Sequence, residues 1–149
     1  MKKVAALIFF CLLSYVAAAQ SAEKISQIIE SDQITYGQSA WLACSYAYED
    51  GESLSFEQAL ATATEKGWLK SGRVSDSPIN LQELCGIFVK ASGLKAGLFY
   101  KFTKADRYAF KELKANKTLD DAADPSMKVS GQNAMAILNA CVKLSGEEK

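Results

Sequence analysis

The residues best suited to recognising a partner are gathered in one stretch, from Gly93 to Leu113. Tyr100, Arg107 and Tyr108 are the candidate partner-binding residues, because tyrosine rings stack on flat surfaces and a guanidinium group binds carboxylates and phosphates. The alternative is that the apolar side chains of this stretch fill a gap between helices while its lysines coat the outside. The apolar side chains concerned are those of Leu98, Phe99, Phe102, Tyr108 and Phe110.

Three of the four cysteines, Cys44, Cys85 and Cys141, follow the N-terminal apolar run. An odd number in an oxidising compartment leaves at least one thiol free or joined to another molecule. All three lie in apolar helical contexts, so we expect buried thiols that behave as small hydrophobic groups. A bridge between Cys44 and Cys141 is the only pairing left open, because the two lie at similar distances from the starts of their helices.

The sequence predicts no catalytic, cofactor-binding or metal-binding residues. It contains no histidine, which excludes histidine zinc sites and histidine-assisted nucleophiles. Asp120, Asp121 and Asp124 lack the alternating ligands and central glycine of an EF-hand and indicate a solvated loop. Scattered carboxylates acting on a cell-envelope polymer are the alternative function, but none has an apolar setting that would raise its pKa. We therefore expect a protein that is not an enzyme.

Composition predicts one globular domain. Of the 149 residues, 49% are hydrophobic and 23% are charged, as in ordinary folded domains. Basic and acidic residues balance at 17 each. Arg73 and Arg107 are the only arginines, and arginine is the residue favoured for phosphate and base recognition, so nucleic acid is not an expected partner.

The first 19 residues have the pattern of a signal peptide. Lys2 and Lys3 precede an apolar run over residues 4–16, and Ala17-Ala18-Ala19 supplies small residues before a cut at Gln20. Cleavage removes two lysines and no acid, which leaves 15 basic and 17 acidic residues and a net charge of −2. We expect an exported bacterial protein, periplasmic or envelope-associated, with no transmembrane segment in the mature chain.

The helix predicted over residues 78–93 organises the rest of the chain. Asn80 caps its first turn, Glu83 completes a capping box, and Gly93 closes the end. Its apolar residues recur at helical spacing and define one buried face. They are Leu84, Ile87, Phe88 and Ala91.

The same cap-led design occurs three times, opened by Thr35, Asn80 and Ser130 at separations of 45 and 50 residues. A further helix precedes each later copy: one ends at Gly67, and the other closes with Asn116 in the left-handed conformation. We therefore predict an all-α fold, a compact bundle of helix-loop-helix pseudo-repeats. The repeats are placed near 34–50, 53–94 and 105–144 within a single domain 34–149, preceded by a short segment 20–33.

With these elements placed, the sequence resembles the S-layer homology family of helical repeats. The resemblance covers about residues 34–144 and is carried by Gly67-Trp68-Leu69 in the turn, Pro78 in the loop, and Asn80 and Glu83 in the helix-opening motif. It implies three repeats in a pseudo-threefold helical bundle. It also implies a role in holding anionic cell-wall polysaccharide.

The arginine of the family's helix-opening motif, which suits anionic sugar groups, is replaced here by Tyr36, Leu81 and Gly131. We therefore expect weak or no binding of acidic wall polymer. Contact with an envelope protein or a cell-wall glycan should depend instead on the three candidate residues named first. The run 97–100 leading into 107–113 also resembles exported spirochaete proteins of unassigned role. The expected function is thus an exported, noncatalytic binding module.

Overall fold

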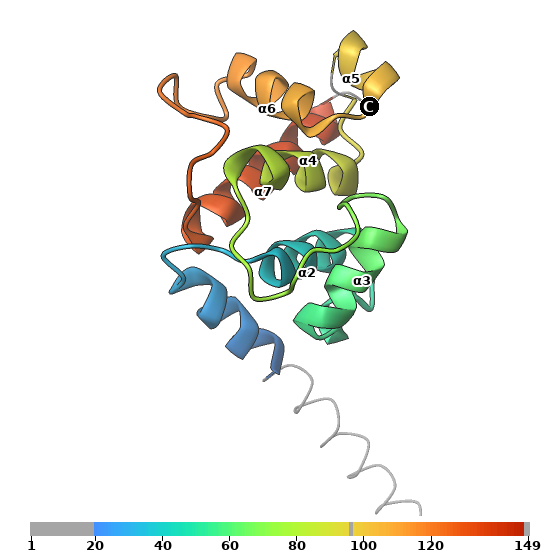
Figure 1. Cartoon of the computed structure of the whole chain (residues 1–149), viewed down its shortest axis with the longest axis vertical. Coiled ribbons are helices and arrows are strands. Elements are labelled where there is room, and N and C mark those ends of the chain that lie inside the picture. The colour runs from blue at the N-terminus through green and yellow to red at the C-terminus, as the bar shows by residue number, and fades with distance from the viewer. Residues whose placement is uncertain (1–19, 96, 148–149) are drawn as a thin grey trace, which may run out of the picture.

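The computed structural model describes residues 20–95 and 97–147, and this part of the chain is all-α, as predicted (Figure 1). A helical segment over 20–29 comes first. The following elements are α2 (Tyr36–Ala47), the 3-10 turn η1 (Gly51–Ser53), α3 (Phe56–Glu65), α4 (Leu81–Ser92), α5 (Leu98–Thr103), α6 (Asp106–Ala115) and α7 (Gly131–Glu147). The proposed export signal, residues 1–19, lies outside the described residues.

Helix α4 lies at the centre of the bundle, with α2 and α3 on one side and α6 on the other (Figure 1). It packs against α2, α6 and α7, and α2 packs in turn against α3. Leu84, Ile87 and Phe88 have no accessible surface, so the apolar face predicted from their spacing is the centre of the core. This confirms the central role of the stretch 78–93.

We expect Leu84→Ala to lower the free energy of unfolding by about 2 to 5 kcal/mol, because the truncation leaves a cavity in a fully buried aliphatic site. Ile87→Ala should have a similar effect. Urea denaturation monitored by circular dichroism measures the change. A loss below about 0.5 kcal/mol would place this face outside the core.

Reciprocal capping boxes open α2 and α3, pairing Thr35 with Gln38 and Ser55 with Gln58. Helix α4 differs from the prediction. The Asn80 side chain accepts from the Glu83 backbone N–H at 2.9 Å, but the Glu83 carboxylate does not complete the box. It accepts hydrogen bonds from side chains instead, because stronger donors lie within reach. These donors are Tyr36, Arg73 and Asn80.

The ends of α3 and α4 follow the glycine pattern, with Gly67 and Gly93 at positive φ. The residue predicted to close α6 in the left-handed conformation was wrong by one position. Asn116 has a φ of −79°, and Lys117 has the left-handed φ of 55°. Lys117 lies 50 residues after Gly67, so the position in the repeat decides the conformation, even though a lysine there is less favourable than glycine.

The three cap-led helices begin at one shared junction. The residues before the caps, Ile34, Ile79 and Val129, are buried, and their backbones join: Ile79 N–H donates to Ile34 O at 3.1 Å and Ile34 N–H to Val129 O at 2.8 Å. The first helical residues repeat the arrangement. Tyr36, Leu81 and Gly131 donate backbone N–H groups to Ser77, Met127 and Ser31 at 2.9, 3.0 and 2.9 Å. The three copies are therefore joined in a cycle.

The second and third helix pairs share one construction, offset by 50 residues without a gap. Five pairs of positions that are related by this offset are buried in both helix pairs. The matching buried pairs are Ala59 and Ala109, Leu60 and Phe110, Ala63 and Leu113, Leu69 and Leu119, and Ile79 and Val129. This fixed offset identifies equivalent positions in the two pairs, including positions at which the two pairs carry different residue types.

The segment 20–29 packs onto the bundle. Ile28 has no accessible surface. Lys24 Nζ donates to the Leu54 carbonyl at 2.7 Å, and Ser21 Oγ donates to Glu52 at 3.0 Å. Along 20–95 and 97–147, no helix has both the length and the apolar character needed to cross a bilayer.

Candidate functional site

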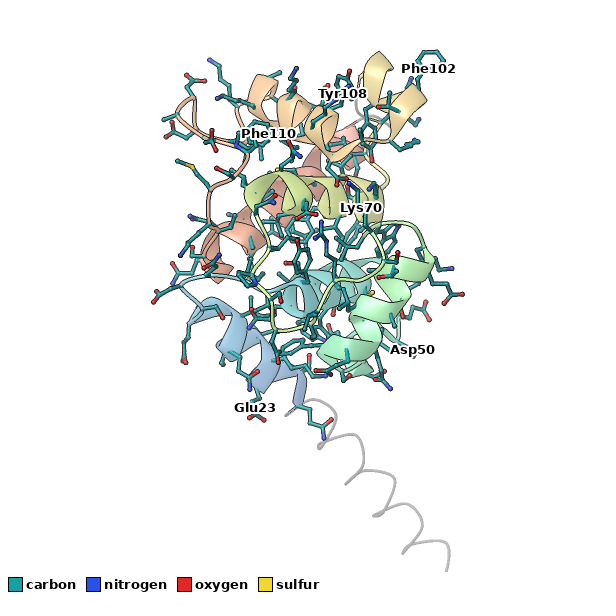
Figure 2. All side chains as sticks on the ribbon, in the orientation of Figure 1. Glu23, Asp50, Lys70, Phe102, Tyr108 and Phe110 are labelled. Carbon is teal, nitrogen blue, oxygen red and sulfur yellow. The ribbon has the colours of Figure 1, made fainter. Side chains whose placement is uncertain are left out.

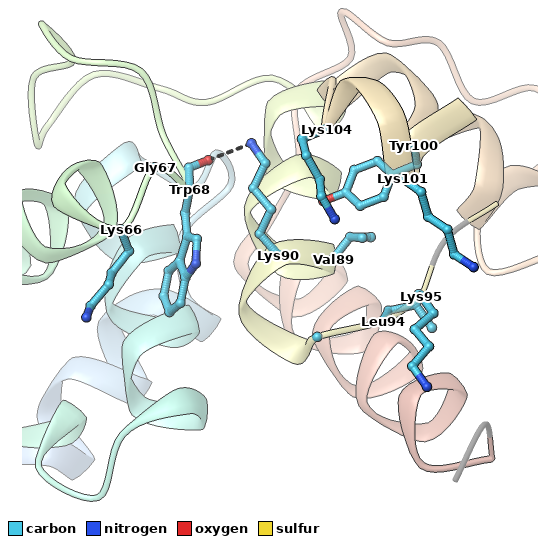
Figure 3. A pocket seen from close by; sticks show the side chains of 11 residues that line it. Lys66, Gly67, Trp68, Val89, Lys90, Leu94, Lys95, Tyr100, Lys101 and Lys104 are labelled. Atoms are coloured by element: carbon cyan, nitrogen blue, oxygen red, sulfur yellow. Dashed lines mark hydrogen bonds between the residues drawn. The ribbon is translucent and has the colours of Figure 1, made fainter. Parts of the chain in front are cut away.

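A pocket of about 460 Å³ lies between the turn after α3, the C-terminal half of α4 and helix α5 (Figure 3). We call it the lysine pocket. Its described lining residues are Lys66, Gly67, Trp68, Val89, Lys90, Gly93, Leu94, Lys95, Tyr100, Lys101 and Lys104. The volume is typical of sites for small molecules.

Five lysines contribute to this lining, and no carboxylate is among the described lining residues. Lys90 is held in place, because its Nζ donates to the Trp68 carbonyl at 3.1 Å (Figure 3) and also to Asp106 Oδ1 at 2.9 Å. The charge of Lys90 is therefore partly balanced by Asp106, which does not line the pocket. Lys66, Lys101 and Lys104 leave the pocket with an excess of positive charge.

Two aromatic rings border the lysine pocket. Tyr100 is only 4% exposed, and burial together with the Asp106 charge raises the pKa of its hydroxyl to about 12, so it is a neutral hydrogen-bonding group. Lys104 Nζ lies 5.2 Å from the centre of this ring. On the other side, Trp68 stacks on Tyr48 with ring centres 5.9 Å apart and planes 12° apart. Both rings are thus fixed before any ligand arrives.

The structure separates the three predicted partner-binding residues. Tyr100 lines the lysine pocket, but Arg107 and Tyr108 are not among its lining residues. Helix α6 turns Ala109, Phe110 and Leu113 into the core, which leaves Arg107 exposed on its outer side and Tyr108 at the margin of the core. There the Arg107 guanidinium lies 4.7 Å from the Tyr108 ring centre and donates to the Tyr108 hydroxyl at 3.0 Å.

The gap-filling alternative holds for part of the insertion. Phe110 is 6% exposed and packs in the core, and Tyr108 is partly buried against it. Phe102 is 81% exposed and fills no gap (Figure 2). The reason is that this stretch forms the separate helix α5, which the sequence patterns did not predict.

Sequence reasoning missed Trp68, Lys66 and Lys90 as pocket residues. They come from the second helix pair, more than thirty residues upstream of Tyr100 in the case of Trp68 and Lys66. The only sequence feature that pointed to this part of the pocket was the turn Gly67-Trp68-Leu69. It predicted the end of a helix and did not indicate that Trp68 lies near α5. Proximity across the bundle is what brings these residues to α5.

A second hollow, the apolar groove, has a volume of about 480 Å³ and lies between the loop 118–129 and α7. The corresponding residues of the other copies show why it is open. Tyr36 Oη donates to Glu83 at 2.5 Å, and Arg73 pairs with Glu83 and lies 5.1 Å from the Tyr36 ring. The groove has instead the shorter Leu81, 45 residues after Tyr36, and the shorter Ala123 and Asn133, 50 residues after Arg73 and Glu83.

All three described cysteines are free and have no accessible surface, which confirms the prediction that they are buried. Burial raises the pKa of Cys44 to about 11 and that of Cys141 to about 12. It raises the pKa of Cys85 further, with the neighbouring Cys141 as the next cause. The closest electrostatic partner of Cys141 is thus Cys85 and not Cys44, whose Sγ contacts the Ala59 carbonyl at 3.7 Å. Neutral buried thiols are unsuited to nucleophilic catalysis.

We expect a thiol assay of the mature chain, denatured without reductant, to count three free thiols per molecule, because the structure leaves Cys44, Cys85 and Cys141 unbridged. Reduction should then change the unfolding free energy little. A count of one thiol would instead support a bridge, and peptide mapping would identify its two cysteines.

Asp120 and Asp124 accept hydrogen bonds from backbone N–H groups of their own loop. Asp120 Oδ1 accepts the Ala122 N–H at 2.8 Å, and Asp124 Oδ1 accepts the Ser126 N–H at 2.9 Å. The Ser126 hydroxyl also donates to Asp124 Oδ1, and this bond, followed by the bond from the Ser126 N–H, holds the pKa of Asp124 below its usual value. Among the residues that the structure describes, no three potential metal ligands converge.

Comparisons with family models, curated proteins and solved structures give no match for this chain. The ligand class is therefore inferred from the lysine pocket itself.

Proposed function

We propose that the protein is an exported, noncatalytic module of the bacterial envelope or periplasm that binds a glycan partner in the lysine pocket, through an acidic sugar. The observation that carries the proposal is the gathering of five lysines and two fixed aromatic rings around one pocket of about 460 Å³. Over the whole mature sequence acids outnumber bases, so this concentration of cations is local.

The pocket chemistry suits such a ligand. Lysine ammonium groups act as point charges for carboxylates and phosphates, and they retain freedom to adjust to the ligand. The Trp68 ring is only partly buried and has one face against Tyr48, so its remaining surface is available for contact with the C–H face of a sugar. A pocket of this size holds a group of roughly one or two rings.

The S-layer homology likeness is part of the proposal for the fold, and the cyclic junction of three cap-led helices supports it. The motif positions offer no cation for a ligand. Tyr36 is bound to Glu83, Leu81 is 6% exposed, and Gly131 carries no side chain. We therefore retain the expectation that a long acidic wall polymer laid along the repeats binds weakly, and we assign recognition to a terminal acidic group that enters the lysine pocket.

Calorimetric titration with a disaccharide that contains glucuronic acid, compared with its glucose counterpart, tests the proposal. We expect only the acidic sugar to bind, with affinity that falls as salt rises. Lys101→Ala with Lys104→Ala should weaken binding about tenfold or more. The matched control is Lys128→Ala with Lys143→Ala, which removes the same charge from exposed positions outside the pocket. Equal binding of both sugars, or equal losses in both double variants, would contradict the proposal.

A further inference from the structure

We infer that helix α5 docks the protein onto an anionic lipid surface, with Phe102 as the side chain that enters the interface. Phe102 is 81% exposed, the highest value among the exposed large hydrophobic residues of the described chain. The next is Val74 at 63%, which lies in the loop before α4. This inference goes beyond the proposed function, because Phe102 does not line the lysine pocket, although the lysines beside it do.

The fold presents Phe102 at the outside of the molecule. Tyr100 is buried and lines the lysine pocket, while residues 101–104 are all exposed. The helix ends at Lys104, whose φ is 50° and whose N–H closes on the Tyr100 carbonyl at 2.8 Å. Helix α5 therefore protrudes at one end of the bundle, and the Phe102 ring points away from the body (Figures 1 and 2).

The charges next to Phe102 in the sequence have one sign, and the Glu112 carboxylate, which accepts the Gly97 N–H at 3.1 Å, lies at the other end of α5. From Gly93 to Ala105 the sequence carries Lys95, Lys101 and Lys104 and no acidic residue. The next acid, Asp106, is paired with Lys90. Basic residues beside an exposed aromatic ring are attracted to anionic headgroups, while the ring itself partitions to the boundary with the acyl chains.

A lipid surface fits these observations better than a protein does. A stable protein interface needs a broad apolar centre with few charges, whereas here the exposed Phe102 ring is flanked by lysines. Lysine side chains extend their charged ends toward headgroups while their carbon chains lie along the apolar region. The contact is interfacial, since α5 has only six residues and cannot span a bilayer.

Co-sedimentation of the mature chain with vesicles tests this inference. We expect binding to phosphatidylcholine vesicles that contain phosphatidylglycerol, little binding to phosphatidylcholine alone, and loss of binding at high salt. Phe102→Ser should lower the partition coefficient about tenfold. Val74→Ser, the matched change at another exposed apolar residue, should leave it unaltered. In Phe102→Trp, vesicles should shift the tryptophan emission to shorter wavelength relative to the parent chain.

Equal binding to both kinds of vesicle, or equal losses in Phe102→Ser and Val74→Ser, would overturn the inference. So would recovery of an envelope protein that depends on Phe102 in the absence of vesicle binding. The Phe102→Ser variant is also titrated with the acidic disaccharide, which should bind as before. Failure of the vesicle test with intact sugar binding therefore counts against the docking surface alone, and loss of sugar binding in the parent chain counts against the proposed function alone.

Discussion

Gly131→Ala is expected to lower the free energy of unfolding by about 5 kcal/mol or more, beyond the usual range for added volume in a packed site. A Cβ at this position would lie 1.6 Å from the Ile28 carbonyl oxygen and 2.5 Å from its carbon. Both are backbone atoms, so no side-chain rotation relieves the clash. The backbone N–H of Gly131 also donates to the Ser31 carbonyl at 2.9 Å, and that bond holds the two segments together. Relief requires the segment 20–29 to leave the bundle and expose Ile28.

Gly146→Ala is the matched control, because Gly146 belongs to the same helix and a Cβ there meets nothing within 4 Å. It should be neutral or stabilising by up to about 1 kcal/mol. Urea unfolding of both variants gives the comparison. Deletion of residues 20–30 should remove most of the penalty for Gly131→Ala, because the clashing carbonyl is then gone. A penalty below about 1 kcal/mol in the full mature chain would show that Ile28 does not pack against Gly131.

The same contact explains why position 131 carries no side chain. A side chain there would occupy the place of the Ile28 backbone. In the first copy, Tyr36 meets Glu83 and Arg73 at the equivalent position. The residues at positions 36 and 131 are therefore tied to packing between segments. Packing of this kind is not visible in a pattern of four residues.

The local rules predicted most of the helices, because their causes lie within a few residues. The caps at Thr35, Ser55 and Ser130 each bond to the third residue that follows. The same rule failed for Glu83, since Tyr36 lies 47 residues away in sequence and still reaches its carboxylate. A charge-assisted bond to a distant partner competes with the local cap, and the sequence pattern shows only the local option.

The candidate site was predictable only in part. Tyr100 stood out because the insertion concentrates aromatic and basic residues. The lysine pocket also needs Lys66 and Trp68, which reach α5 only after α3 and α4 have packed. Arg107 was chosen for its chemistry, but the helical register of α6 directs it to the outer surface beside Tyr108. Side-chain type indicated the region, and packing decided which residues share a surface.

The second large effect is expected at alkaline pH. The unfolding free energy should fall steeply from about pH 9 upward, and the fold should be lost near pH 12. Three thiols have folded-state pKa values above the ordinary 9.0, namely Cys44, Cys85 and Cys141. A pKa that is higher in the folded state means that the unfolded chain releases its proton first. The stabilisation is complete below the unfolded pKa and is lost as the pH rises toward the folded value.

The expected slope of the unfolding free energy against pH follows from the number of protons that only the folded chain retains. Each proton retained only by the folded chain contributes about 1.4 kcal/mol per pH unit, so three thiols give up to about 4 kcal/mol per unit. Tyr36 and Tyr100 add to the loss above about pH 10, since burial is the main reason that both pKa values are raised to about 12. A total stability of about 5 to 15 kcal/mol is then exhausted within a few pH units.

Urea unfolding at several pH values between about 8 and 11 measures this slope, and Cys141→Ala separates the thiols from the tyrosines. Removing one buried thiol should reduce the slope by about a third between pH 9 and 10, whatever the variant's stability at neutral pH. Tyr36→Phe should leave the slope in that interval unchanged and reduce it only at higher pH, because its hydroxyl retains its proton beside Glu83 until later. Stability that stays constant up to pH 11 would mean that the thiols ionise in the folded chain, and hence that the helices bearing them pack less closely than their buried positions require.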